Sequence, residues 1–81
     1  MDELEPQPKR SRYLDGTKLR QKRIAKGLAP SELAVKAGTS RAAVSHHEQG
    51  DYGCLMPQLR AYANALECDP SDLMLDAASA A

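Results

Sequence analysis

The chain has 81 residues, with no Trp or Phe, three Tyr and two Cys, and its formal net charge is zero. A chain of this length forms one domain, and its core must come from Leu, Ala, Val, Ile and Met, a set that favours helices over strands. So small a domain has little volume for a catalytic pocket, so we expect a binding module and not an enzyme.

The charges are unevenly distributed along the chain. Residues 1–8 carry three acidic side chains, and residues 9–26 carry eight basic side chains against Asp15 alone, a net charge of +7. Residues 54–81 carry one basic and four acidic side chains, a net charge of −3. Such a chain can bind nucleic acid with its basic region although its total charge is zero. The alternative is an ordinary solvated helix face, which would carry the same lysines.

The sequence shows no secretory signal and no apolar run long enough to cross a membrane, which predicts a cytoplasmic protein with reduced thiols. Cys54 and Cys68 have no CxxC spacing and form no redox motif. Together with His46 and His47 they would make four potential zinc ligands, but their spacing matches no zinc-finger pattern. We therefore expect no metal and no other cofactor.

Residues 1–12 are expected to form a disordered basic arm, residues 13–75 the folded domain, and residues 76–81 a disordered tail. The first helix is predicted from Thr17 to Lys26, with Asp15 or Thr17 as its cap and Gly27 after its end. Leu19 and Ile24, with the stem of Arg23, are expected to face inward.

The second helix is predicted from Pro30 to Ala37, because proline suits the first helical turn, and Gly38 ends it. A third helix is predicted to begin after Ser40, a favourable cap, and to continue to about Gln49, before Gly50. Val44 and His47 are expected on its buried side. The opposite side carries Arg41, Ala42, Ser45 and His46.

The fourth helix opens at Pro57 and carries an apolar stripe made of Leu59, Tyr62, Ala63 and Leu66. Asp69 and Pro70 predict the start of a last short helix that holds Leu73. The fold class predicted from these segments is all-α, a compact bundle of five short helices.

The run from Gly27 to Gly50 resembles the helix-turn-helix of the Cro and lambda-repressor-like family, also called the xenobiotic response element family. Ala34 stands where the family has a small residue, Gly38 at the turn, and Val44 at the buried position between the two helices. The resemblance extends from about Leu14 to Leu75, with the helix-turn-helix unit at residues 30–49, and implies a lambda-repressor-like DNA-binding domain. It also implies a structural ion pair between Arg23 and Glu48, for which a loose surface pair is the alternative.

The chain departs from the family pattern at several positions. Pro30 replaces a glutamine that binds phosphate in many members, and Ala29 replaces a capping threonine. His47 occupies a position that is more often large and apolar, and residues 50–54 lack the basic side chains of some members.

The resemblance implies that the third helix enters the major groove and exposes its first turns to base edges. Arg41 is the expected main reader, since a guanidinium can bond O6 and N7 of guanine, although it could bind only phosphate. Ala42 would touch a thymine methyl group or act as a spacer. Ser45 and His46 would contact base or phosphate, and His46 could equally be solvated; if it binds DNA, its protonation would tighten binding at low pH.

Phosphate contacts are expected from Lys18 and Lys22 on the first helix, with Ser40 and the N–H groups that open the third helix. Lys9, Arg10 and Arg12 would follow the duplex or enter the minor groove, or would serve only solubility.

These features predict a sequence-specific transcriptional regulator, a repressor that binds double-stranded DNA as a homodimer at an inverted repeat. The alternative is a protein-interaction adaptor or an antitoxin-like protein that binds a protein partner with the same bundle. The neutral net charge, Pro30 and the loop at residues 50–54 favour the alternative, and the basic stretch with Arg41 favours DNA.

Overall fold

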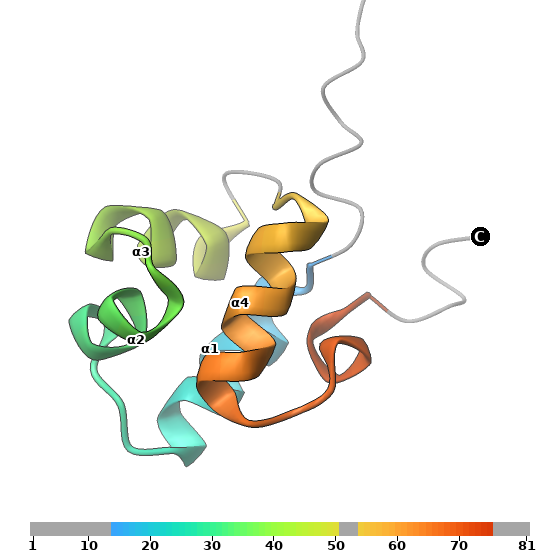
Figure 1. Cartoon of the computed structure of the whole chain (residues 1–81), viewed down its shortest axis with the longest axis horizontal. Coiled ribbons are helices and arrows are strands. Elements are labelled where there is room, and N and C mark those ends of the chain that lie inside the picture. The colour runs from blue at the N-terminus through green and yellow to red at the C-terminus, as the bar shows by residue number, and fades with distance from the viewer. Residues whose placement is uncertain (1–13, 51–53, 76–81) are drawn as a thin grey trace, which may run out of the picture.

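A computed structural model describes residues 14–50 and 54–75 of the chain. These residues form four α-helices and one short 3₁₀ turn (Figure 1). In chain order the elements are α1 (Gly16–Ala25), α2 (Pro30–Ala37), α3 (Arg41–Gln49), α4 (Met56–Leu66) and η2 (Pro70–Leu73). The predicted all-helical class is confirmed, whereas the predicted arm (1–12) and tail (76–81) lie outside the described residues.

The prediction of a fifth helix is wrong, because the segment that follows Asp69 is a 3₁₀ turn of four residues. Its backbone bond runs from the N–H of Asp72 to the carbonyl of Asp69 at 2.9 Å, which is a three-residue step. Met74 is already extended, with φ −92° and ψ 156°. A segment this short cannot close a second turn, so it keeps the tighter 3₁₀ geometry.

Capping residues set the starts of the helices. The carboxylate of Asp15 accepts hydrogen bonds from the N–H groups of Thr17 (2.9 Å) and Lys18 (3.4 Å), and Ser40 Oγ accepts from the N–H of Ala43 at 3.0 Å. Ala29 has no side-chain acceptor to offer, but its own N–H donates to Glu32 Oε1 at 2.7 Å. The start of α2 is therefore stabilised from within its first turn.

The turn between α2 and α3 is made by Gly38, which has φ 70° and ψ 36°. This left-handed conformation is favourable for glycine and strained for most other residues. The N–H of Thr39 then donates to the carbonyl of Ala34 at 2.9 Å, which closes the end of α2. The second helix runs from Pro30 to Ala37 and the third ends at Gln49, as their capping residues predicted.

One apolar cluster joins all five elements. Tyr62 is its largest fully buried side chain, and all four residues of the predicted stripe on α4 are buried in the core. The other elements contribute Leu19, Leu33, Ala34, Val44 and Leu73.

Ile24 does not join this core, contrary to the expectation that it faces inward, and its exposed fraction is 55%. Leu19, on the same helix, is fully buried. Five residues of α-helix turn the side chain by roughly 140° beyond a full revolution, so the two side chains cannot share one face. Arg23, one turn after Leu19, faces inward as predicted, and its side chain is only 11% exposed.

The helices cross so that α2 and α3 lie together on one side of the domain and η2 lies on the other (Figure 1). The two ends of the domain meet beside η2: Leu14 and Met74 form an isolated antiparallel bridge, and the N–H of Asp15 donates to the carbonyl of Leu73 at 2.8 Å. None of the helices in this part of the chain is long and apolar enough to cross a membrane.

Candidate nucleic-acid interface

The third helix has two different faces. Val44 is fully buried and His47 is 8% exposed, so this face packs into the core. On the opposite face Arg41 and Ala42 are exposed, and Ser45 and His46 are half-buried. The sequence predicted this division, which follows from the 3.6-residue period of a helix.

The four side chains of the outer face, together with Pro30 at the start of α2, line an open hollow of about 290 Å³. The residues that the sequence singled out for reading bases are therefore brought together by the structure. Pro30 was not among them, since it was noted only as a departure from the family pattern. The hollow combines a guanidinium, a hydroxyl and an imidazole with the apolar surfaces of Pro30 and Ala42.

Arg23 ties the last turn of α3 to α1. Its Nε lies 2.6 Å from Glu48 Oε2 and its Nη2 lies 3.2 Å from Glu48 Oε1, a bidentate arrangement. Its Nη1 also donates to the carbonyl of Leu28 at 2.8 Å. The two side chains are only 11% and 8% exposed, so the expected ion pair is present and shielded from solvent.

His47 ties the same turn of α3 to α4, and sequence reasoning missed this contact. A hydrogen bond of 2.6 Å joins its Nδ1 to the Tyr62 hydroxyl, and the two rings meet edge to face at 5.5 Å. Burial, more than the neighbouring Cys54 and Glu48, raises the pKa of Tyr62 well above its ordinary value, so the phenol is neutral. The available signal was a histidine three residues after the buried Val44, together with a tyrosine inside an apolar stripe.

Gly16 provides a third connection at this end of α3. A Cβ atom built on Gly16 would collide with the backbone carbonyls of His47 and Glu48. The first turn of α1 therefore lies directly against the last turn of α3, an approach that only glycine permits.

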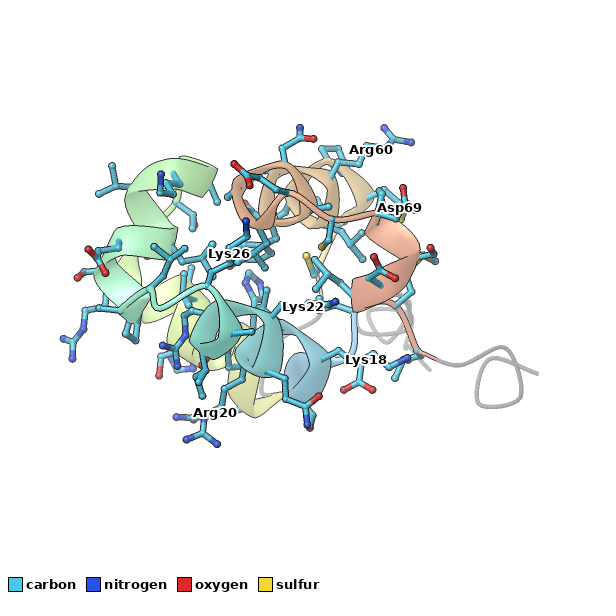
Figure 2. All side chains as sticks on the ribbon, turned by 90° about the horizontal axis from the view of Figure 1, so that it is seen from below. Lys18, Arg20, Lys22, Lys26, Arg60 and Asp69 are labelled. Atoms are coloured by element: carbon cyan, nitrogen blue, oxygen red, sulfur yellow. The ribbon has the colours of Figure 1, made fainter. Side chains whose placement is uncertain are left out.

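Apart from Arg23, the basic residues of α1 and its C-cap Lys26 divide into two groups. Lys18 Nζ donates to the carbonyl of Met74 at 2.9 Å, and Lys26 Nζ pairs with Glu67 at 2.6 Å. Lys22 lies between them, and in Figure 2 all three point toward α4 and η2. Arg20 points to the opposite side of α1 (Figure 2).

Arg20 follows Gly16 by one turn, roughly 40° further around the helix, and thus shares the side of α1 that touches α3. Sequence reasoning chose Lys18 and Lys22 as phosphate contacts on charge alone and omitted Arg20. The only signal for Arg20 was the four-residue spacing from a glycine. The helical period therefore places Arg20, and not the two lysines, on the side of α1 that faces α3.

Two further expectations concern the basic arm with the loop at residues 50–54, and a possible metal site. Lys9, Arg10 and Arg12, predicted to contact the DNA backbone, lie outside the described residues, as does most of the loop at residues 50–54. Within residues 14–50 and 54–75, no three His, Cys, Asp or Glu side chains come together as a metal site.

Known proteins share this arrangement of helices. The helix-turn-helix domain family matches residues 16–75 of the chain. A comparison with curated proteins found no match.

Among solved structures, the restriction-modification controller protein C.AhdI from Aeromonas hydrophila is 33% identical, with a TM-score of 0.69 over 70% of this chain and 83% of that one. The P22 c2 repressor, solved in complex with a synthetic operator, is 28% identical, with a TM-score of 0.67 over 70% of this chain and 86% of that one. The clp gene regulator ClgR from C. glutamicum is 30% identical, with a TM-score of 0.67 over 70% and 74%. With the family match over residues 16–75, the chain belongs to the helix-turn-helix family of DNA-binding transcription regulators, in its Cro and lambda-repressor-like branch.

Proposed function

We propose that this chain is a sequence-specific repressor that reads the major groove of double-stranded DNA with α3, which we call the recognition helix. One observation carries the proposal: the outer face of α3 gathers Arg41, Ala42, Ser45 and His46 around one hollow. The opposite face of the same helix is bonded to α1 and α4. A helix held in this way can enter the major groove without losing its position.

Arg41 is the main base reader in this proposal. It is the first residue of α3 and is exposed, and its guanidinium can bond both O6 and N7 of guanine. Ser45 and His46 follow it along the same face and reach the next base edges or phosphates. Ala42 supplies an apolar contact.

Phosphate contacts position the recognition helix on the duplex. Ser40 and the free N–H groups at the start of α3 form one such contact, since helix N-termini attract anions. On α1 we assign the second contact to Arg20, because it lies on the side toward α3. Lys18 and Lys22 form the alternative set.

We further propose that two copies bind an inverted repeat in the cytoplasm, with half-sites about 34 Å apart, one helical turn of DNA. The similarity to the P22 c2 repressor, whose structure contains a synthetic operator, supports repression over activation.

The experiment is selection of binding sites from a random duplex library at physiological salt, followed by sequencing. A two-fold symmetric motif is expected. Arg41→Ala should weaken binding by about 5- to 150-fold, since a bidentate contact contributes about 1–3 kcal/mol, and should remove one base preference from the motif.

Arg60→Ala is the matched control, because Arg60 is an exposed arginine on α4. This variant should select the same motif as the unchanged protein. Recovery of no motif would reject the proposal and direct the search to a protein partner.

A further inference from the structure

The last residue of α3, Gln49, is hydrogen-bonded to Ser45. Gln49 Nε2 donates to Ser45 Oγ, and the two atoms are 3.3 Å apart. Residues four apart lie one above the other on the same side of a helix. Ser45 lines the hollow on the outer face of α3, whereas Gln49 is exposed. The bond therefore connects a residue of the proposed DNA-reading face to an exposed residue outside the core.

This bond determines which part of the Ser45 hydroxyl is left for a ligand. A hydroxyl has one hydrogen to donate and two lone pairs that accept, and the Gln49 amide uses one of the lone pairs. Within residues 14–50 and 54–75, the Ser45 side chain makes no other hydrogen bond, so it does not donate to the carbonyl of Arg41, the usual partner of a helical serine. The hydrogen points away from Gln49, because the donated bond occupies the opposite side of the oxygen.

Base edges in the major groove differ in whether they accept or donate hydrogen bonds. Guanine offers the acceptors N7 and O6, and thymine offers the acceptor O4, whereas cytosine offers only its N4 amino donor. A hydroxyl that presents its hydrogen can bond guanine or thymine. Opposite cytosine it places a donor against a donor, which leaves a buried polar group without a partner. A hydroxyl that rotates freely would adapt to either kind of base.

We infer that Gln49 is a positioning residue that holds Ser45 as a hydrogen-bond donor, so that the protein prefers guanine or thymine to cytosine at the base that Ser45 meets. Gln49 acts through Ser45 and does not itself touch the base. The inference rests on the proposed function, in which α3 lies in the major groove. The bond is exposed in the free protein, and it strengthens in the complex because the duplex excludes water from it.

The spacing along α3 indicates where this base lies. Ser45 follows Arg41 by four residues, which is about 6 Å along the helix axis. Stacked base pairs are about 3.4 Å apart. The base that Ser45 meets is therefore one or two base pairs from the guanine that Arg41 reads.

The test uses the operator found by site selection, with each base pair of a half-site replaced in turn by the other three, and fluorescence anisotropy to measure the dissociation constants. The position that Ser45 meets is the one whose base preference is lost in Ser45→Ala. At this position the unchanged protein should bind guanine or thymine about tenfold more tightly than cytosine.

Two substitutions of Gln49 test its role. In Gln49→Glu the introduced carboxylate can only accept, so the Ser45 hydrogen turns toward it and the lone pairs face the base. The preference should then reverse in favour of cytosine. In Gln49→Met no hydrogen-bonding group remains to orient the hydroxyl, and the ratio of affinities should fall toward one.

Gln21→Glu is the matched control, because Gln21 is an exposed glutamine on α1 and the substitution adds the same charge. It should keep the preference of the unchanged protein. Each ratio is measured within one protein, so a general loss of affinity caused by the added negative charge cancels.

The inference is overturned if Gln49→Glu keeps the preference for guanine or thymine, if Gln49→Met keeps the full ratio, or if Ser45→Ala changes the preference at no position. These outcomes leave the proposed function intact, since the selected motif and the effect of Arg41→Ala do not depend on Gln49. Failure to select any motif would instead overturn the proposed function and this inference with it.

Discussion

His47 Nδ1 lies 2.6 Å from the Tyr62 hydroxyl, so a hydrogen bond inside the core joins the recognition helix to α4. The next residue, Glu48, is paired with Arg23 of α1. Consecutive residues of a helix point roughly 100° apart, and these two therefore reach two different helices from the same turn. The C-terminal end of α3 is held from both sides, which leaves its outer face exposed in a fixed position.

Arg23→Met should lower the free energy of unfolding by about 3 kcal/mol, because it leaves the carboxylate of Glu48 shielded from water without its cation. Urea denaturation followed by circular dichroism measures this loss. Lys26→Met is the matched control, since the Lys26–Glu67 pair is 40% and 76% exposed and solvent screens it, so a much smaller loss is expected. Equal losses in the two variants would contradict the structural role of Arg23.

Gly16→Ala should destabilise the fold by about 1–3 kcal/mol, because the added methyl group forces α1 away from the carbonyls of His47 and Glu48. Thermal unfolding measures the change. In Gln21→Ala, an exposed position on the same helix, stability should stay within about 0.5 kcal/mol of the unchanged protein. A stable Gly16→Ala protein would mean that α1 and α3 do not approach so closely.

Tyr62→Phe removes one hydroxyl group and keeps the ring in the core. We expect the free energy of unfolding to fall by about 1 kcal/mol, the typical contribution of one hydrogen bond. The Nδ1 resonance of His47 in the nitrogen NMR spectrum should shift at the same time, because this atom loses its hydroxyl partner. An unshifted resonance would show that the bond is absent in solution.

Stability should decrease in alkaline solution because of Cys54. Burial raises the pKa of its thiol from 9.0 to about 11, so the folded state keeps the proton that the unfolded chain releases. The resulting stabilisation is fully present below pH 9.0 and is lost as the pH rises toward about 11. Urea denaturation at pH 8 to 11 should show this decrease, and Cys54→Ala should show a smaller one over the same interval; an identical decrease would contradict the assignment.

The salt dependence of DNA binding separates the two sets of α1 cations. If Arg20 contacts a phosphate, Arg20→Ala should reduce the slope of log affinity against log salt by about 0.9 per protomer. Lys18→Ala should leave the slope unchanged, because Lys18 points toward η2 and is bonded to the Met74 carbonyl. The reverse result would favour the phosphate contacts from Lys18 and Lys22 that the sequence predicted.

Local signals account for what the sequence predicted well. Pro30, Gly38 and Ser40 act within a few residues of their own positions, and they gave the correct bounds of α2 and the correct start of α3. The apolar stripe on α4 is equally local, since it depends only on the helical period. The Arg23–Glu48 pair was found through the family resemblance, and its residues are 25 positions apart.

The features that the sequence did not reveal depend on how the helices are placed relative to one another. Nothing near Gly16 in the sequence indicates that the end of α3 passes over it. The partner of His47 is 15 residues away on another helix, and the choice between Arg20 and Lys18 depends on which side of α1 meets α3. Ile24 was misplaced for a different, local reason: it lies roughly 140° around α1 from Leu19, which faces the core.

The bridge between Leu14 and Met74 joins the two ends of the domain, so that residues near each end stabilise the other. Lys18 Nζ reaches the Met74 carbonyl across 56 residues of sequence, and the N–H of Asp15 reaches Leu73. Fraying at one end therefore removes partners from the other. In hydrogen exchange, the amide of Asp15 should open at the same rate as the turn at η2, so that the two ends of the domain unfold as one cooperative unit.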